Sequence, residues 1–272
     1  MTPNSDMTTM DPIIGFCVFI LGLVTGSFLN VCIVRMPEEK SIVTPRSHCV
    51  HCRKTIPWYD NIPIFSYLGL KGRCRFCGKK ISPRYVLVEL LTGIIFVELY
   101  RNFGWNTILV AYCAMTAGLI VATFVDLEHR IIPDEISIGG MVLGLILSMF
   151  IPSLHDTNSF FASAGRSLLG ILVGGGSIYA MGLIGDFIFK KESMGGGDVK
   201  LLGMVGAFLG WKLALLSFFV APFFGAIFGI IVKLRTKEST IAYGPFLSLG
   251  ALISLLWGEP LINWIIHGYG LH

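Results

Sequence analysis

The chain has 272 residues, of which 54% are hydrophobic and only 14% are charged, and its net charge is +4. Soluble domains carry about a quarter charged residues, so this composition excludes an ordinary soluble enzyme as well as a disordered chain. A polytopic membrane protein remains, provided that the apolar residues form blocks of about 20.

Apolar blocks of this kind recur along the chain and predict an all-α polytopic membrane protein with about eight transmembrane helices. The first block, residues 12–34, has no Lys or Arg before it and no small-residue cleavage site after it, so we predict a retained helix. A polar insert at 35–85 separates it from the others. These lie near 86–100, 105–125, 136–151, 167–189, 199–210, 213–232 and 241–266.

The Lys and Arg residues predict how these helices are oriented. With the N-terminus outside the cell, the segments on the cytoplasmic side are 35–85, 126–135, 190–200 and 233–240. They hold 18 of the 21 basic residues, and the opposite face holds 3. Because cytoplasmic loops retain Lys and Arg, we predict a periplasmic N-terminus and a cytoplasmic insert. The positive net charge then reflects membrane topology, and we predict no nucleic-acid partner.

The polar insert contains two Cys-x-x-Cys pairs, Cys49 with Cys52 and Cys74 with Cys77. Four thiolates at this spacing suit a tetrahedral Zn²⁺ ion. Two disulfides or a thioredoxin-like redox site are the alternatives. A cytoplasmic location disfavours disulfides, and the insert lacks the strand–helix pattern of a redox motif. We predict structural zinc, because four protein ligands leave no open position for a substrate.

Two aspartates stand at span ends that are predicted to face the cytoplasm. Asp126 closes the block 105–125, and Asp198 opens the block 199–210. Acids at membrane depth are costly and suggest function. A pair of carboxylates that shares one proton can hydrolyse a peptide bond, with one taking a proton from water and the other polarising the carbonyl.

Three glycines precede Asp198 directly: Gly195, Gly196 and Gly197. Glycines let an extended substrate backbone approach closely and leave backbone amides free to bind it. We therefore predict that these three residues bind substrate. A second glycine run, 174–176, lies inside a span. It predicts close helix packing, because no strand precedes it as a nucleotide-binding loop would require.

Each acid also has a structural interpretation. Asp126 could cap a loop, and Asp134 could cap a helix that begins near Glu135. Asp186 could pair with Lys190 at helical spacing. Taken singly, these interpretations are favoured; the functional hypothesis rests on two acids at one predicted depth.

Four sequence features occur in order across nearly the whole chain. They are Gly26–Val31 with Arg35 and Pro37; Pro45–Ser47 with Cys49, Cys52, Ile62–Pro63, Cys74 and Cys77; Ile81–Tyr85 followed by Glu89–Gly93; and Asp126 with Ile132–Asp134, followed by Gly195–Leu201. In this combination the chain resembles the type IV prepilin peptidases, also called leader peptidase/N-methyltransferases, among the membrane aspartic proteases with a Gly-x-Gly-Asp motif.

The resemblance implies that Asp126 and Asp198 are the catalytic pair. It implies removal of a basic leader from type IV prepilins or type II secretion pseudopilins at the cytoplasmic face of the bacterial inner membrane. It also implies methylation of the new N-terminus with S-adenosylmethionine, because bifunctional members carry the four cysteines. The methyl-donor site is not predicted, with Glu89 and the segment 26–37 as candidates only.

The predicted domain organisation follows from these features. Residues 1–34 form the periplasmic N-terminus and first transmembrane helix, 35–85 the cytoplasmic zinc-binding domain, and 86–272 the transmembrane aspartic peptidase core. The expected partners are the substrate proteins and the lipid bilayer.

Two other functions fit part of the pattern. Another intramembrane aspartyl protease, of the presenilin type, would usually carry Tyr-Asp where Val125-Asp126 stands. A proton-coupled transporter could use the acids as proton relays, but the chain shows no internal repeat of hydropathy.

Overall fold

The computed structural model describes residues 11–190, 194–236 and 242–268, and within these ranges its elements are helices. The N-terminal residues 1–10, predicted to be periplasmic, lie outside the described part, as do portions of the predicted loops 190–200 and 233–240. The chain divides into two compact units, the first ending at Trp105 and the second beginning at Asn106.

The N-terminal unit consists of two long helices with the polar insert between them. Its elements are α1 (Pro12–Arg35), a short α2 (Phe65–Gly69), α3 (Arg84–Phe103), and 3₁₀ turns at Met36–Glu38 and Trp58–Asn61. The long helices touch through glycines, because a Cβ atom on Gly22 would lie 2.7 Å from the Cα of Gly93, and one on Gly26 2.7 Å from the Cα of Glu89. Small residues at such contacts let membrane helices approach closely.

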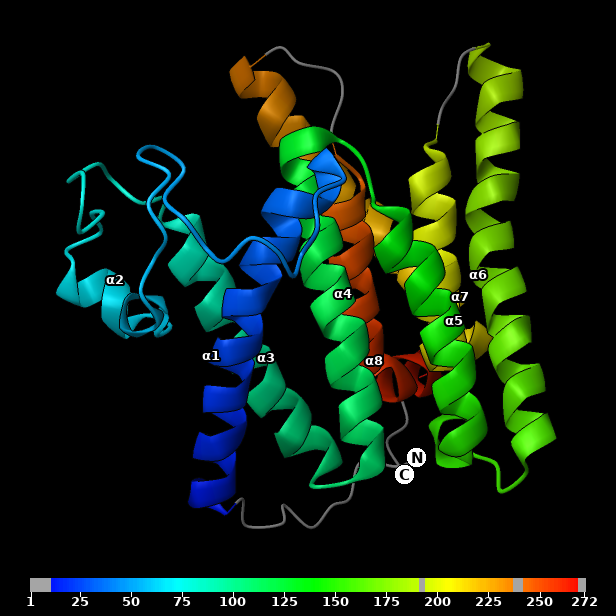
Figure 1. Cartoon of the computed structure of the whole chain (residues 1–272). Coiled ribbons are helices and arrows are strands. Elements are labelled where there is room, and N and C mark those ends of the chain that lie inside the picture. Colours follow the sequence, from blue (N-terminus) through cyan, green and yellow to red (C-terminus); the bar gives the residue numbers. More distant parts are fainter. Residues whose placement is uncertain (1–10, 191–193, 237–241, 269–272) are drawn as a thin grey trace. The chain divides into compact units, whose positions relative to one another are not determined.

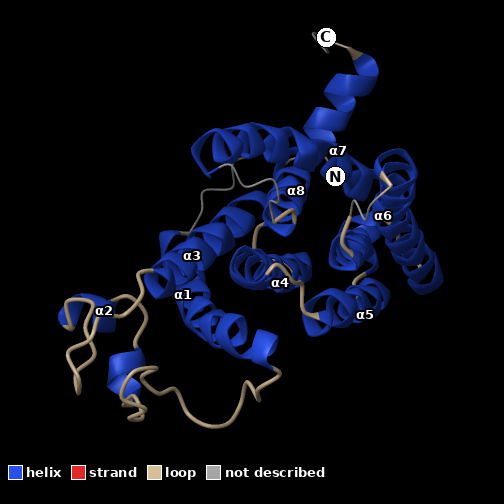
Figure 2. Ribbon diagram, turned by 90° about the horizontal axis from the view of Figure 1, so that it is seen from above, coloured by secondary structure: helices blue, strands red, loops and turns tan. Residues whose placement is uncertain are grey.

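The C-terminal unit is a bundle of long helices. They are α4 (Thr107–His129), α5 (Asp134–Phe150), α6 (Phe160–Phe189), α7 (Gly196–Thr236) and α8 (Gly244–His267), with a 3₁₀ turn at Pro152–His155. Figure 1 shows α4, α5, α6 and α8 side by side, and Figure 2 shows them nearly end on. The helix α8 packs against both α7, which precedes it, and the distant α4.

The helix α7 is two helices joined at a reversal. Gly210 has φ 74° and ψ 173°, which is not helical. A Cβ on Gly174 of α6 would lie 2.5 Å from the carbonyl oxygen of Leu202 and 3.4 Å from the Cβ of Ala214. In a straight helix these two residues would be about 18 Å apart. The chain therefore folds back near Gly210, and Figure 1 shows both ends of α7 at the same end of the bundle.

The predicted spans agree with this architecture. Each of the eight apolar blocks falls mainly within a helix of the described ranges, and the blocks 199–210 and 213–232 are the two arms of α7. Within the described ranges, five helices are long and apolar enough to cross a membrane. The predicted all-α polytopic fold class is confirmed, and the packing expected for the glycine run appears at Gly174 and Gly175, which face the backbone of α7.

Candidate active site and cysteine cluster

The structure buries Asp126 near the C-terminal end of α4. Its side chain is only 6% exposed. The carboxylate Oδ2 accepts a hydrogen bond from the backbone N–H of Gly244, at 2.8 Å, at the start of α8. A buried carboxylate needs such a partner, because an unpaired charge is costly away from water. The first turn of α8 therefore fixes where this acid lies.

Only glycine permits the approach at position 244. A Cβ atom added there would lie 2.7 Å from Asp126 Oδ2 and 3.3 Å from its Cβ. Pro245 follows in the first turn of α8, where proline starts a helix favourably. A Gly-Pro pair signals a helix start in the sequence, but nothing in it indicates a contact with Asp126, and the sequence analysis missed this residue.

Asp198 lies in the first turn of α7, where a negative charge is favourable to the helix dipole. Its side chain is half-buried, and its backbone N–H donates to the carbonyl of Gly195 at 3.1 Å. The carboxylates of Asp126 and Asp198 are near enough for their charges to act on each other. The structure thus brings together the two acids that the sequence analysis selected.

Tyr243 is a further polar residue beside the two acids, and it was not predicted from the sequence. Its hydroxyl is buried and has no hydrogen-bond partner in the described part of the chain. The hydroxyl is close enough to Asp198 for the charge of that carboxylate to act on it. A phenol hydroxyl carries a proton and is an available donor. Tyr243 thus lies near Asp198, while the next residue, Gly244, holds Asp126.

The glycines before Asp198 have different surroundings. α7 begins at Gly196, so Gly196 and Gly197 are helical and only Gly195 precedes the helix. A Cβ on Gly195 would lie 3.4 Å from Asp198 Oδ2, one on Gly197 would meet Ile132 at 3.1 Å, and one on Gly196 would meet nothing within 4 Å. Their role in substrate binding stays a prediction.

Two other acids have structural partners. Asp134, in the first turn of α5, forms an exposed ion pair with Lys200 of α7 at 2.7 Å. Glu89 of α3 is buried, and its Oε2 accepts the backbone N–H of Ile64 at 2.8 Å. Glu89 therefore holds the loop before α2, which gives this acid a structural task.

The four cysteines of the insert form one cluster. The sulfur atoms of Cys49, Cys52, Cys74 and Cys77 all lie within 4.8 Å of one another, and the thiols are free. Such a set of soft donors around one point could hold a metal ion.

The two cysteine pairs sit on matching turns. In the first, the N–H of Arg53 donates to the carbonyl of Cys49 at 2.8 Å; in the second, the N–H of Gly78 donates to the carbonyl of Cys74 at 2.9 Å. Both donor residues have a positive φ, 57° at Arg53 and 69° at Gly78. The turns direct the two pairs of thiols toward one point.

The backbone also prepares one thiol for metal binding. Hydrogen bonds from the backbone N–H groups of Cys77 and Phe76 lower the pKa of Cys74 to about 7. A thiolate, and not a thiol, is the metal ligand. The backbone of this turn therefore favours the ligand form of Cys74.

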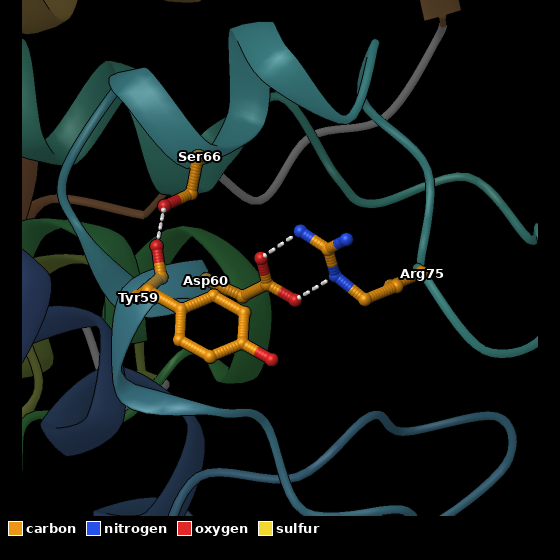
Figure 3. Close-up of polar contacts among 4 residues, drawn as sticks. All are labelled: Tyr59, Asp60, Ser66 and Arg75. Carbon is orange, nitrogen blue, oxygen red and sulfur yellow. Dashed lines mark hydrogen bonds and ion pairs between the residues drawn. The ribbon is translucent and has the colours of Figure 1, made fainter.

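An ion pair joins the second cysteine turn to the linker before it. The guanidinium of Arg75 donates to both carboxylate oxygens of Asp60, each at 2.6 Å, and lies over the ring of Tyr59 (Figure 3). The Arg75 guanidinium holds the pKa of the Asp60 carboxyl below its usual range. This planar, two-point contact restrains the linker relative to the cysteines.

Comparisons with known proteins identify the family of the chain. Residues 20–103 match the model of the bacterial peptidase A24 N-terminal domain, and residues 113–230 match the type IV leader peptidase family. A prepilin leader peptidase/N-methyltransferase of Myxococcus xanthus is 42% identical over 88% of this chain and 69% of its own length. The chain belongs to the type IV leader peptidase family.

Other relatives cover nearly the whole chain. A prepilin leader peptidase/N-methyltransferase of Pseudomonas aeruginosa is 34% identical, with 90% of this chain and 91% of the relative covered. An Escherichia coli protein, named a type 4 prepilin-like proteins leader peptide-processing enzyme, is 37% identical over 86% of this chain and 90% of its own. No solved structure matches the chain.

The family confirms the predicted resemblance and makes the chain a peptidase. With its long apolar helices, it is a multi-pass membrane protein. The two matched models cover the two compact units almost separately, since the first ends at residue 103 and the second begins at 113.

Proposed function

We propose that the chain removes the leader peptide from type IV prepilins or pseudopilins, with Asp126 and Asp198 as the catalytic pair. The observation that carries this proposal is the buried Asp126, held by Gly244 and within electrostatic reach of Asp198. The printed names of the relatives support the substrate class.

The chemistry follows from two carboxylates that share one proton. The ionised carboxylate takes a proton from a water molecule as the water adds to the scissile carbonyl carbon, and the protonated one donates to the carbonyl oxygen. The carbon–nitrogen bond then breaks, and the amine leaves with a proton. The hydroxyl of Tyr243, a buried donor near Asp198, is available to donate a hydrogen bond to an oxygen of the tetrahedral intermediate.

We infer that this chemistry takes place at the inner face of the bacterial inner membrane. The support is the distribution of basic residues, with 18 of 21 in the segments assigned to the cytoplasm. A substrate could then keep its apolar helix in the lipid while its basic leader reaches the aspartates from the cytosol.

The metal that fits the cysteine cluster best is zinc. Four thiolates in a small polar segment suit Zn²⁺, which would tie the two cysteine turns together and leave no position for a substrate. We infer a structural ion whose binding stabilises the insert.

Methylation of the new N-terminus, with S-adenosylmethionine as donor, follows the names of the relatives. Part of the segment 26–37 lines a groove in the N-terminal unit. This groove is lined by two arginines, Arg35 and Arg46, and by no carboxylate. That lining suits an anion better than a sulfonium cation. We therefore propose the methylation activity without assigning residues to the methyl-donor site.

The aspartate pair is tested by removing each acid. We expect Asp126→Asn and Asp198→Asn each to lower prepilin cleavage roughly 10³-fold, because the amide cannot exchange the proton. Mass spectrometry of a prepilin incubated with enzyme and S-adenosylmethionine reports leader removal and methyl addition together. Asp134→Asn, at an exposed pair, is the matched control and should cleave normally. Normal cleavage by either dyad variant would rule the pair out.

The hydrogen bond from Gly244 is tested by Gly244→Ala. The added methyl group must displace the Asp126 carboxylate, and a misplacement of about 1 Å can reduce the rate roughly 100-fold. We expect kcat for prepilin cleavage to fall while KM changes little. Gly139→Ala, where a Cβ meets nothing within 4 Å, controls for the loss of a glycine. An unchanged kcat in Gly244→Ala would show that this contact does not position the acid.

Elemental analysis of the purified protein tests the metal. We expect about one zinc ion per chain, lost in Cys49→Ser and in Cys74→Ser, because a tetrahedral site needs all four thiolates. Cys17→Ser, at an exposed thiol of α1, should keep the metal. Wild-type protein that holds no zinc would contradict the assignment.

A further inference from the structure

A groove of about 590 Å³ opens in the N-terminal unit between α1 and the insert. This volume is in the range of small-molecule sites. One wall is a stripe on α1, where Val24, Phe28 and Val31 follow one another at helical spacing, and the other comes from the insert near Val43 and Ile62. The function proposed above uses none of these residues.

The chemical character of the groove changes along its length. Val24, Phe28 and Val31 are apolar, whereas Arg35 lies at the C-terminal end of α1, about 16 Å from Val24 and about 6 Å from Val31 along the helix axis. Its guanidinium donates to the carbonyls of Ser41 and Pro45, at 2.9 and 2.7 Å, and so fixes the loop there. The groove therefore joins an apolar channel to a cationic end.

Arg46 supplies a free positive charge at the cationic end. It directly follows the loop that Arg35 holds, and it lines the groove with Ser47 and Asn61. The side chain of Arg46 is exposed and has no hydrogen bond or ion pair within the ranges that the structure describes. The lining contains no carboxylate. An apolar molecule with an anionic head matches this arrangement.

The surroundings favour a lipid as this molecule. α1 is one of the helices long and apolar enough to cross a membrane, so its stripe lies at bilayer depth. The insert carries 11 Lys and Arg against 3 acids, and it exposes Trp58 (73%), Phe65 (67%) and Leu68 (65%). Aromatic and basic residues together are typical of surfaces that rest on anionic lipid.

The position of the insert is consistent with contact to the bilayer. Figure 1 shows α2 beside the long helices of its unit and within the length of α1. Its apolar side chains would then lie at the level of the lipid headgroups, where such residues are stabilised by burial.

We propose that the groove is a binding site for an anionic phospholipid. One acyl chain lies along Val24, Phe28 and Val31, and the phosphate pairs with Arg46 and accepts hydrogen bonds from Ser47 and Asn61. The bound lipid connects the insert to the membrane helix and holds the insert at the bilayer surface. The proposal does not depend on which reaction the enzyme performs.

Lipid titration by native mass spectrometry tests the site. Delipidated full-length protein in detergent is mixed with phosphatidylglycerol or with phosphatidylcholine of the same acyl chains. We expect tighter binding of phosphatidylglycerol, and an affinity about fivefold weaker in Arg46→Ala, because one basic residue near a lipid headgroup contributes about that factor. Arg101→Ala, which removes a charge at the other end of α3, should bind as the wild type does. Inorganic phosphate, which has no acyl chain, should not compete.

A photoactivatable phosphatidylglycerol locates the acyl chain. We expect cross-links concentrated in residues 24–31 and 42–47, and their loss in Val31→Trp, which fills the groove. Unchanged zinc content and an unchanged unfolding temperature show that the variants are folded. If Val31→Trp does not fold, lipid binding by Arg46→Ala, a change at an exposed residue, tests the site instead. Equal affinity for the two lipids, an unaffected Arg46→Ala, or displacement of the lipid from these residues by a prepilin would overturn the proposal.

Discussion

The C-terminal unit depends on keeping a carboxylate buried near the end of a membrane helix. Asp126 is 6% exposed, and a charge so placed needs a compensating partner. That partner is a backbone N–H from the start of α8, and glycine at position 244 is the residue that allows it. Because the donor belongs to a helix end, the position of the acid and the packing of α8 are determined together.

The same requirement explains the path of the chain. α7 reverses at Gly210, so its first turn, which carries Asp198, and the start of α8 are at one end of the bundle. The small residues of α6 and α7 make the tight reversal possible. Tyr243 and Gly244 then connect the two acids, one residue near each. Both acids therefore lie at helix ends, and the rest of each helix supports them from within the bundle.

Much of this could be predicted from the sequence. Hydropathy located the long helices of the described ranges, including the two arms of α7, because apolar length is a local property, but it gave no sign of the short α2 in the polar insert. The cysteine spacing located the cluster because a Cys-x-x-Cys pair is also a local pattern. The contact between Asp126 and Gly244 spans 118 residues and uses a backbone N–H, which every residue except proline carries, so no residue type marks it. The helical start at Gly196 was also missed, because glycine has a low helix propensity and the apolar residues begin only at Val199.

The insert shows how a short polar segment can keep a defined structure. It has little apolar core, and small domains need additional links. The cysteine cluster supplies one link and the pair of Asp60 with Arg75 a second, while Glu89 joins the loop before α2 to the membrane helix α3. Arg53 adopts a positive φ at the position where the matching turn has Gly78. Residues other than glycine rarely adopt a positive φ, so the sequence does not indicate this turn at Arg53.

The claim that the two aspartates act as one unit is tested most directly by a double-mutant cycle on prepilin cleavage. Rates are compared for the wild type, Asp126→Asn, Asp198→Asn and the variant with both changes. If the acids share one proton and one water molecule, the double variant should be no slower than the slower single variant, because either change alone disables the pair. Losses that multiply, or a single variant that cleaves at the wild-type rate, would contradict the account.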